Sequence, residues 1–147
     1  MAYHYKESGL DNVFLENGYT VHQTPYGEGV SIHDTEGLHR LIGEQIVAGP
    51  KRINGAEFRF LRLAMELSQR NIAAIIGSEE QTVRRWEKCR NQPVNGPADR
   101  LIRLLYTEYV GGNVKIRDAV DRLAKLDQID RTEIRLREDH DHWRAAA

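Results

Sequence analysis

The stretch SQRNIAAIIGSEEQTVRRWEK, residues 68–88, decides how the central part of this chain folds. Its apolar residues recur three and four positions apart, which predicts two short helices. Ser68 is a typical N-cap residue for the first helix, and Gly77 gives the conformational freedom that a tight turn between the two requires. The second helix is predicted from about residue 79 or 80 to Lys88. The side chains predicted to face inward are Ile72, Ala73, Ile76, Val83 and Trp86.

The outward face of the second helix carries polar side chains at helical spacing. Gln81 and Arg85 are four residues apart and Arg84 is three from Gln81, so they share one exposed face. In a DNA major groove, glutamine can bond adenine, arginine can bond guanine, and a glutamate such as Glu80 can accept from cytosine. The predicted base-reading residues are therefore Gln81, Arg85, Arg84 and Glu80. A solvated helix face is the alternative, and any one of these residues alone would favour it.

The segment around these helices is basic, although the whole chain has a net charge of −1. Residues 51–105 have a balance of +5, whereas residues 1–50 have −5 and residues 106–147 have −1. A basic middle segment is expected of a module that meets phosphate, and a solvated charged surface is the alternative. The side chains predicted to contact phosphate are Ser68, Gln69, Thr82, Lys88 and Arg90.

Length and composition exclude several classes of protein. A chain of 147 residues with 29% charged and 40% hydrophobic residues is typical of one or two small globular domains. Its longest apolar run, Ile72–Ile76, is too short to span a bilayer, and the first residues lack the features of a signal peptide. With Cys89 as the single cysteine, we expect a cytoplasmic protein without a disulfide and without a membrane partner.

The first fifty residues are predicted to form a small β-rich domain with a covering helix. Short runs broken by glycine and proline predict antiparallel strands at residues 3–5, 13–15, 19–22 and 29–32. Tyr3, Tyr5 and Tyr19 are interpreted as part of a small sheet core. Asp34 can cap a helix that runs to about residue 48. The apolar face predicted for that helix is Leu38, Leu41, Ile42 and Ile46.

From Asn54 onward the chain reads as helical. Asn54 and Glu57 have the spacing of a capping box, which predicts a helix ending near Leu67, and Pro97 opens a helix after the loop at Pro93. The apolar residues predicted for these two helices are Phe58, Phe60, Leu61, Met65, Leu101, Leu104, Leu105 and Val110. A fifth helix is predicted at about 114–127. Residues 128–147 are predicted to be a charged tail, with a short strand at Ile134 and Leu136 as the alternative.

The central segment resembles the Cro/Xre class of lambda-repressor-like domains over roughly residues 55–110. The residues that carry the resemblance are Ser68, Gln69, Ile72, Ala73, Gly77, Val83, Arg85, Trp86, Glu87 and Pro93. Cys89 and Ser78 depart from the pattern, because the class usually has glycine and a small apolar residue there. Together with the strand, cap and apolar patterns, the resemblance predicts an α+β fold that is mostly α. These patterns extend the helix-turn-helix domain to residues 54–127, with five helices. It also implies sequence-specific binding of double-stranded DNA.

A narrower resemblance covers more of the chain. The order of elements is similar to that of the MqsA (YgiT-like) antitoxin group. It begins with a β-rich segment, a helix and a linker, and continues with a helix-turn-helix that ends RRWEKCRNQP. That group implies a homodimer, an amide and an arginine on the bases at the positions of Gln81 and Arg85, and an N-terminal zinc domain that binds a toxin.

The predicted metal and cofactor content differs from that group. Residues 1–50 have no cysteine, and His4, His22, His33 and His39 include no tight pair, so we expect neither a metal nor a cofactor. His140 and His142 are expected to face solvent.

Three functions follow as alternatives. The first is a transcriptional regulator, in the simplest case a repressor, that binds a palindromic operator as a dimer. The second is an antitoxin that binds a toxin protein through residues 1–50 and regulates its own operon. The third is a sensor of a small ligand, and no residues in the sequence indicate where its binding pocket would be. An enzyme is not expected, because no nucleophile with a base at motif spacing and no phosphate-binding glycine loop occurs in the sequence.

Overall fold

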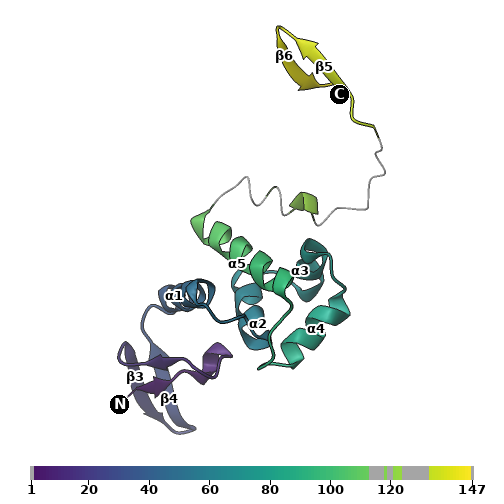
Figure 1. The fold of residues 1–147 in the computed structure, drawn as a ribbon. Helices are drawn as coiled ribbons and strands as arrows, with labels where there is room; N and C mark the ends of the chain where they lie inside the picture. The colour runs from purple at the N-terminus through teal and green to yellow at the C-terminus, as the bar shows by residue number, and fades with distance from the viewer. Residues whose placement is uncertain (1, 113–117, 119–120, 124–132, 147) are drawn as a thin grey trace.

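A computed structural model shows an α+β chain in which small antiparallel sheets flank a group of helices (Figure 1). The structure describes residues 2–112, 118, 121–123 and 133–146. Within those residues no helix is long and apolar enough to cross a membrane.

The N-terminal strands form two separate two-stranded sheets rather than one. Strand β1 (Tyr3–His4) pairs with β2 (Phe14–Leu15), and β3 (Tyr19–Thr24) pairs with β4 (Gly27–Ile32). A short 3-10 turn, η1 (Lys6–Ser8), lies between β1 and β2. The predicted strand positions are confirmed, with β3 and β4 extended toward their turn, because both remain paired up to Thr24 and Gly27.

Helix α1 (Thr35–Ala48) begins where the sequence predicts. The Asp34 side chain accepts a hydrogen bond from the Gly37 N–H at 3.2 Å. Ile42 is buried, but Leu41 is 53% exposed, so its predicted place in the core is wrong. The part of α1 that meets α2 and α5 is covered, whereas Leu41 lies beyond those contacts along an open groove.

Four helices follow: α2 (Gly55–Ala64), α3 (Gln69–Ile76), α4 (Glu80–Lys88) and α5 (Gly96–Gly111). The Asn54–Glu57 capping box is present in both directions, which confirms the predicted start of α2. Helix α2 ends at Ala64 instead of near Leu67. The backbone at Glu66 takes a positive φ of 58°, which no α-helix accommodates.

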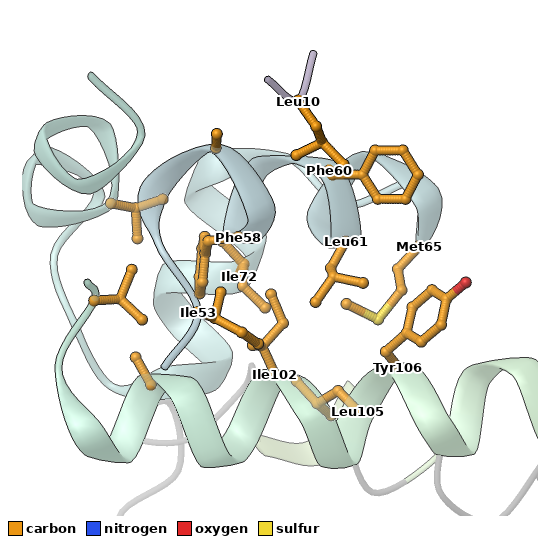
Figure 2. Close-up of a cluster of buried hydrophobic side chains, with 14 of the residues drawn as sticks. Leu10, Ile53, Phe58, Phe60, Leu61, Met65, Ile72, Ile102, Leu105 and Tyr106 are labelled. Carbon is orange, nitrogen blue, oxygen red and sulfur yellow. The ribbon is translucent and has the colours of Figure 1, made fainter. Parts of the chain in front are cut away.

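One hydrophobic cluster joins the N-terminal segment to the helices (Figure 2). Leu10 lies over Phe60 at the top of the view, while α5 closes the bottom of the cluster. The predicted stripe of α5 is partly wrong, because Leu104 is 58% exposed. Ile102 and Tyr106, which the prediction omitted, are buried in its place. The helix is rotated so that its buried line runs through positions 98, 102, 105 and 106.

The last described segment is a β-hairpin. Strands β5 (Leu136–Asp139) and β6 (His142–Ala145) pair across a turn at His140 and Asp141, both with positive φ. A charged tail and a short strand were the two predictions for this region, and the structure contains a strand. Most of the helix predicted at 114–127 lies outside the described residues; within it, residues 118 and 121–123 are helical.

Candidate nucleic-acid interface

Helices α3 and α4 are joined by a tight turn and pack against each other. Ser68 caps α3 by accepting a hydrogen bond from the Asn71 N–H at 3.0 Å. Gly77 has a φ of 81°, and its N–H donates to the Ala73 carbonyl at 2.9 Å. The cap and the turn residue are where the sequence predicts them. The buried side of α3 is Ile72, Ala73 and Ile75, with Ile76 only partly buried.

The inner face of α4 is held by a buried ion pair. Arg62 of α2 donates through Nε and Nη2 to the two carboxylate oxygens of Glu87, each at 2.8 Å. Arg62 also donates through Nη1 to the Leu67 carbonyl at 2.9 Å. Both side chains are less than one-tenth exposed, so the fork fixes α4 against α2. Val83, fully buried, completes this face.

The outer face of α4 is exposed and polar. Gln81 and Arg85 are both exposed, and among the described residues neither side chain has a hydrogen-bond or ion-pair partner. Glu80 and Arg84 are bound to each other, with Arg84 Nη2 2.8 Å from Glu80 Oε1. The structure therefore brings all four predicted base readers to one helix, and it leaves the Gln81–Arg85 pair unengaged.

The predicted phosphate-contacting residues differ in exposure and in whether their side chains already have partners within the fold. Lys88 is exposed at the end of α4, and Thr82 is half-buried in its first turn. The Ser68 hydroxyl caps α3. The Gln69 side chain turns inward and donates to Glu87 Oε1 at 3.1 Å, so one of its two amide hydrogens is used within the fold. Arg90 is likewise engaged, as its contacts with the N-terminal segment show.

Arg90 ties the end of α4 to the N-terminal loop. Its Nη2 donates to the Gly9 carbonyl at 2.9 Å and to Asp11 Oδ1 at 3.2 Å. The backbone carbonyl of Arg90 accepts from the Ala56 N–H at 3.1 Å. The side chain is 43% exposed, so it sits at the edge of this contact rather than inside it. Sequence spacing gives no sign of this tie, because about eighty residues separate the partners.

Two exposed arginines outside the predicted set lie on α3 and α2. Arg70 lies in the first turn of α3, beside Gln69, and is exposed. Arg59 of α2 is 51% exposed, and its Nε lies 4.0 Å from Glu87 Oε1. Helix N-termini and nearby arginines both attract phosphate, so the place of Arg70, two residues after the predicted N-cap Ser68, is a signal that the sequence itself carries.

The loop after α4 is pinned to the start of α2. Val94 N–H donates to the Ile53 carbonyl at 3.0 Å, and Gly55 N–H donates to the Gln92 carbonyl at 3.1 Å. A Cβ at Gly55 would lie 1.8 Å from the Trp86 carbonyl oxygen, so only glycine permits this approach of the two backbones. The end of α4 is therefore fixed on both sides.

A buried carboxylate holds the linker between α1 and α2. Asp99 accepts from the Ile53 N–H at 2.8 Å and from Arg103, whose guanidinium also donates to the Val47, Gly49 and Lys51 carbonyls. Burial alone would raise the pKa of Asp99. The Ile53 hydrogen bond and the charges of Arg103 and Arg100 outweigh it, and the pKa is lowered. Asp99 is thus held ionised in a place where a neutral side chain would be expected.

The histidine and tyrosine side chains of the N-terminal segment make local contacts. His4, His22 and His39 bond to Asp11, Ser31 and Tyr5 respectively, each at 2.8 Å. Tyr5 is buried, and the Tyr3 ring centroid lies 5.3 Å from that of Tyr19, as a small aromatic core requires. The hydrogen bond to Glu7 raises the pKa of Tyr3 to about 12. The described part of the chain contains no group of three His, Cys, Asp or Glu side chains placed to hold a metal ion.

Comparison of the chain with family models, with curated proteins and with solved structures gave no match. What the site does is therefore inferred from its geometry and charge.

Proposed function

We propose that this chain is a sequence-specific DNA-binding transcriptional regulator, acting as a repressor through a helix-turn-helix formed by α3 and α4. The observation that carries the proposal is the division of α4 into two faces. Val83 and Glu87 lock one face into the fold, while Gln81 and Arg85 stand unpartnered on the other. A helix held this way can enter a major groove at fixed depth, with α3 crossing the backbone.

Charge supports the same proposal. The balance of +5 over residues 51–105 surrounds α3 and α4. Lys88 and Arg70 lie exposed at the ends of α4 and α3. Phosphate contacts from such residues supply affinity that does not depend on sequence, whereas Gln81 and Arg85 supply discrimination between bases. We propose a dimer on a palindromic operator, with half-sites about 34–36 Å apart, as a two-fold pair of reader helices requires.

Titration of an operator duplex with two variants tests the roles of these side chains. Arg85→Ala should cost about 1–3 kcal/mol on the operator and should relax the preference at one base pair. Lys88→Ala should weaken binding to every sequence and reduce the slope of affinity against salt by about one. Fluorescence anisotropy over a salt series measures both. Unchanged operator affinity in both variants would show that α4 is not the reader helix.

A second candidate function is masking of a basic protein, as an antitoxin masks its toxin. The observation that favours it is the balance of −5 over residues 1–50. Opposite charge steers such partners together and raises association rates. Affinity capture with the full chain tests this candidate. A variant with Glu16, Glu28 and Glu36 replaced by glutamine is the control. Recovery of the same proteins by both chains would count against the masking role.

A further inference from the structure

Three of the four side chains on one face of the β5–β6 hairpin are apolar. Its register places Leu136 opposite Ala145 and Glu138 opposite Trp143, so these four side chains lie on the same side of the ladder. Leu136 is 60% exposed and Trp143 is 71% exposed. Ile134, just before β5, is 86% exposed. Three large apolar side chains are therefore open to solvent on a very small element.

The other face of the hairpin is ionic. Arg137 and Arg144 lie opposite each other, and Arg144 Nη2 is 2.9 Å from Asp139 Oδ2. These charges are stable in water, so it is the apolar face that lacks a cover. A two-stranded hairpin alone is at best marginally stable, and it gains stability by packing against a helix or further strands.

A second open apolar surface lies between α1 and the β1–β2 segment. A groove of about 410 Å³ runs there, and its apolar lining includes Leu10, Val13, Phe14, Leu38, Leu41 and Ile46. Phe14 and Leu41 are 58% and 53% exposed. One wall of the groove is a helix, which is the kind of surface that a hairpin needs.

We propose that the β5–β6 hairpin docks its apolar face, with Leu136 and Trp143, into this α1 groove of its own chain. The charged face then points to solvent. Both open surfaces are covered by one contact, and the hairpin gains the helix that its stability requires. The groove is thus an intramolecular docking site, separate from the outer face of α4.

The connection between the two surfaces is long enough. Helix α5 ends beside α1, since Tyr106 Oη donates to the Arg40 carbonyl at 3.3 Å. Twenty residues lie between Gly112 and Glu133, and residues 118 and 121–123 are helical, so chain length sets an upper limit of about 60 Å on this span. Helix α1 has 14 residues and is about 21 Å long. The hairpin can therefore reach the groove anywhere along α1.

The size of the hairpin favours its own chain over a second copy. Each strand has four residues and places two side chains on the apolar face. Specific interfaces between separate molecules bury about 1,200–2,000 Å², which so small a face cannot supply by itself. Within one chain, the two surfaces are covalently linked and meet at an effective concentration of order millimolar, so a small apolar contact suffices.

Fluorine NMR of the full chain, with fluorotryptophan at Trp86 and Trp143, tests the docking. Trp143→Phe assigns the two resonances, and the resonance shift between H2O and D2O reports the exposure of each ring. We expect Trp143 to be shielded in the unmodified chain. Leu41→Glu places a charge in the groove and should restore the full solvent shift of Trp143.

Leu104→Glu is the matched control, because Leu104 is 58% exposed but lies on α5 and not in the groove lining. It should leave Trp143 shielded. A Trp143 ring with the full solvent shift in the unmodified chain overturns the proposal. So does a ring that remains shielded in Leu41→Glu.

A cross-link distinguishes the hairpin of the same chain from that of a second copy. Cys89 is exposed and free, so it is first replaced by alanine. Mild oxidation of the Gln45→Cys, Ala145→Cys chain, which keeps Leu41, Leu136 and Trp143, should give a disulfide within one chain. It is seen as a monomer band that loses its free thiols and runs faster than the reduced chain on a non-reducing gel. The Leu104→Cys, Ala145→Cys pair should oxidise more slowly, because Leu104 lies outside the groove lining. A cross-linked dimer would show that the hairpin of a second copy occupies the groove. The absence of any cross-link would show that the hairpin does not dock there. Either result overturns the proposal.

Discussion

At the scale of single residues, the Arg62–Glu87 ion pair holds α4 against α2. The two-point contact at 2.8 Å is buried, so removal of either partner leaves an unpaired charge inside the protein. We predict that Glu87→Ala lowers the free energy of unfolding by about 3–5 kcal/mol. Urea denaturation followed by circular dichroism measures it.

Arg84→Ala is the control for this prediction. Arg84 pairs with Glu80 at a similar distance, but both side chains are more than a third exposed. An exposed pair four residues apart contributes only about 0.3–0.5 kcal/mol. Equal losses in the two variants would mean that the buried pair does not hold α4 in place.

The sequence predicts single residues well where the signal is local. Spacing alone puts Gln81 and Arg85 on one exposed face, and the structure places them there. The Glu87 pair was missed, because Arg62 lies 25 residues earlier and only the packing of α2 on α4 brings the two together. Arg90 shows the same limit, since its exposed partners belong to the N-terminal loop.

Among elements, the crossing of α2 and α4 depends on Gly55. Alanine there would place its Cβ 1.8 Å from the Trp86 carbonyl oxygen, so one backbone must move. Alanine at Gly77 meets no atom within 4 Å and only has to tolerate a φ of 81°. We predict that Gly77→Ala costs about 1–2 kcal/mol and that Gly55→Ala costs more. Urea denaturation compares them, and a smaller loss for Gly55→Ala would contradict the close approach.

Element boundaries followed from capping chemistry more reliably than from apolar periodicity. Asn54, Ser68 and Gly77 each mark a helix end in the sequence, and the structure uses all three. The buried line of α5 was predicted less well, because Leu101, Ile102, Leu104, Leu105 and Tyr106 offer several overlapping stripes. Tertiary packing decides between such stripes: Tyr106 fits against Gly43 of α1, where an added Cβ would lie 2.1 Å from its hydroxyl.

For the whole molecule, Asp99 links the α1–α2 linker to α5. Its pKa is lowered in the fold, so the charged form stabilises the protein above the ordinary aspartate pKa of about 3.9. That contribution is lost as pH falls below this value toward the folded-state pKa. We predict that Asp99→Asn unfolds more easily at neutral pH and loses less further stability below about pH 4 than the unmodified chain. Urea midpoints of both chains over a pH series measure this. If the midpoints of the variant and the unmodified chain changed in parallel with pH, the prediction would be contradicted.

We propose that the exposed face of α4 reads a palindromic DNA sequence. Selection of bound duplexes from a random pool tests this most directly. The full chain should enrich one palindrome whose half-sites lie about 10–10.5 base pairs apart, or a multiple of that spacing. The Arg85→Ala chain should enrich the same palindrome with one position relaxed. Failure of the unmodified chain to enrich any sequence, while the protein remains folded, would contradict the claim.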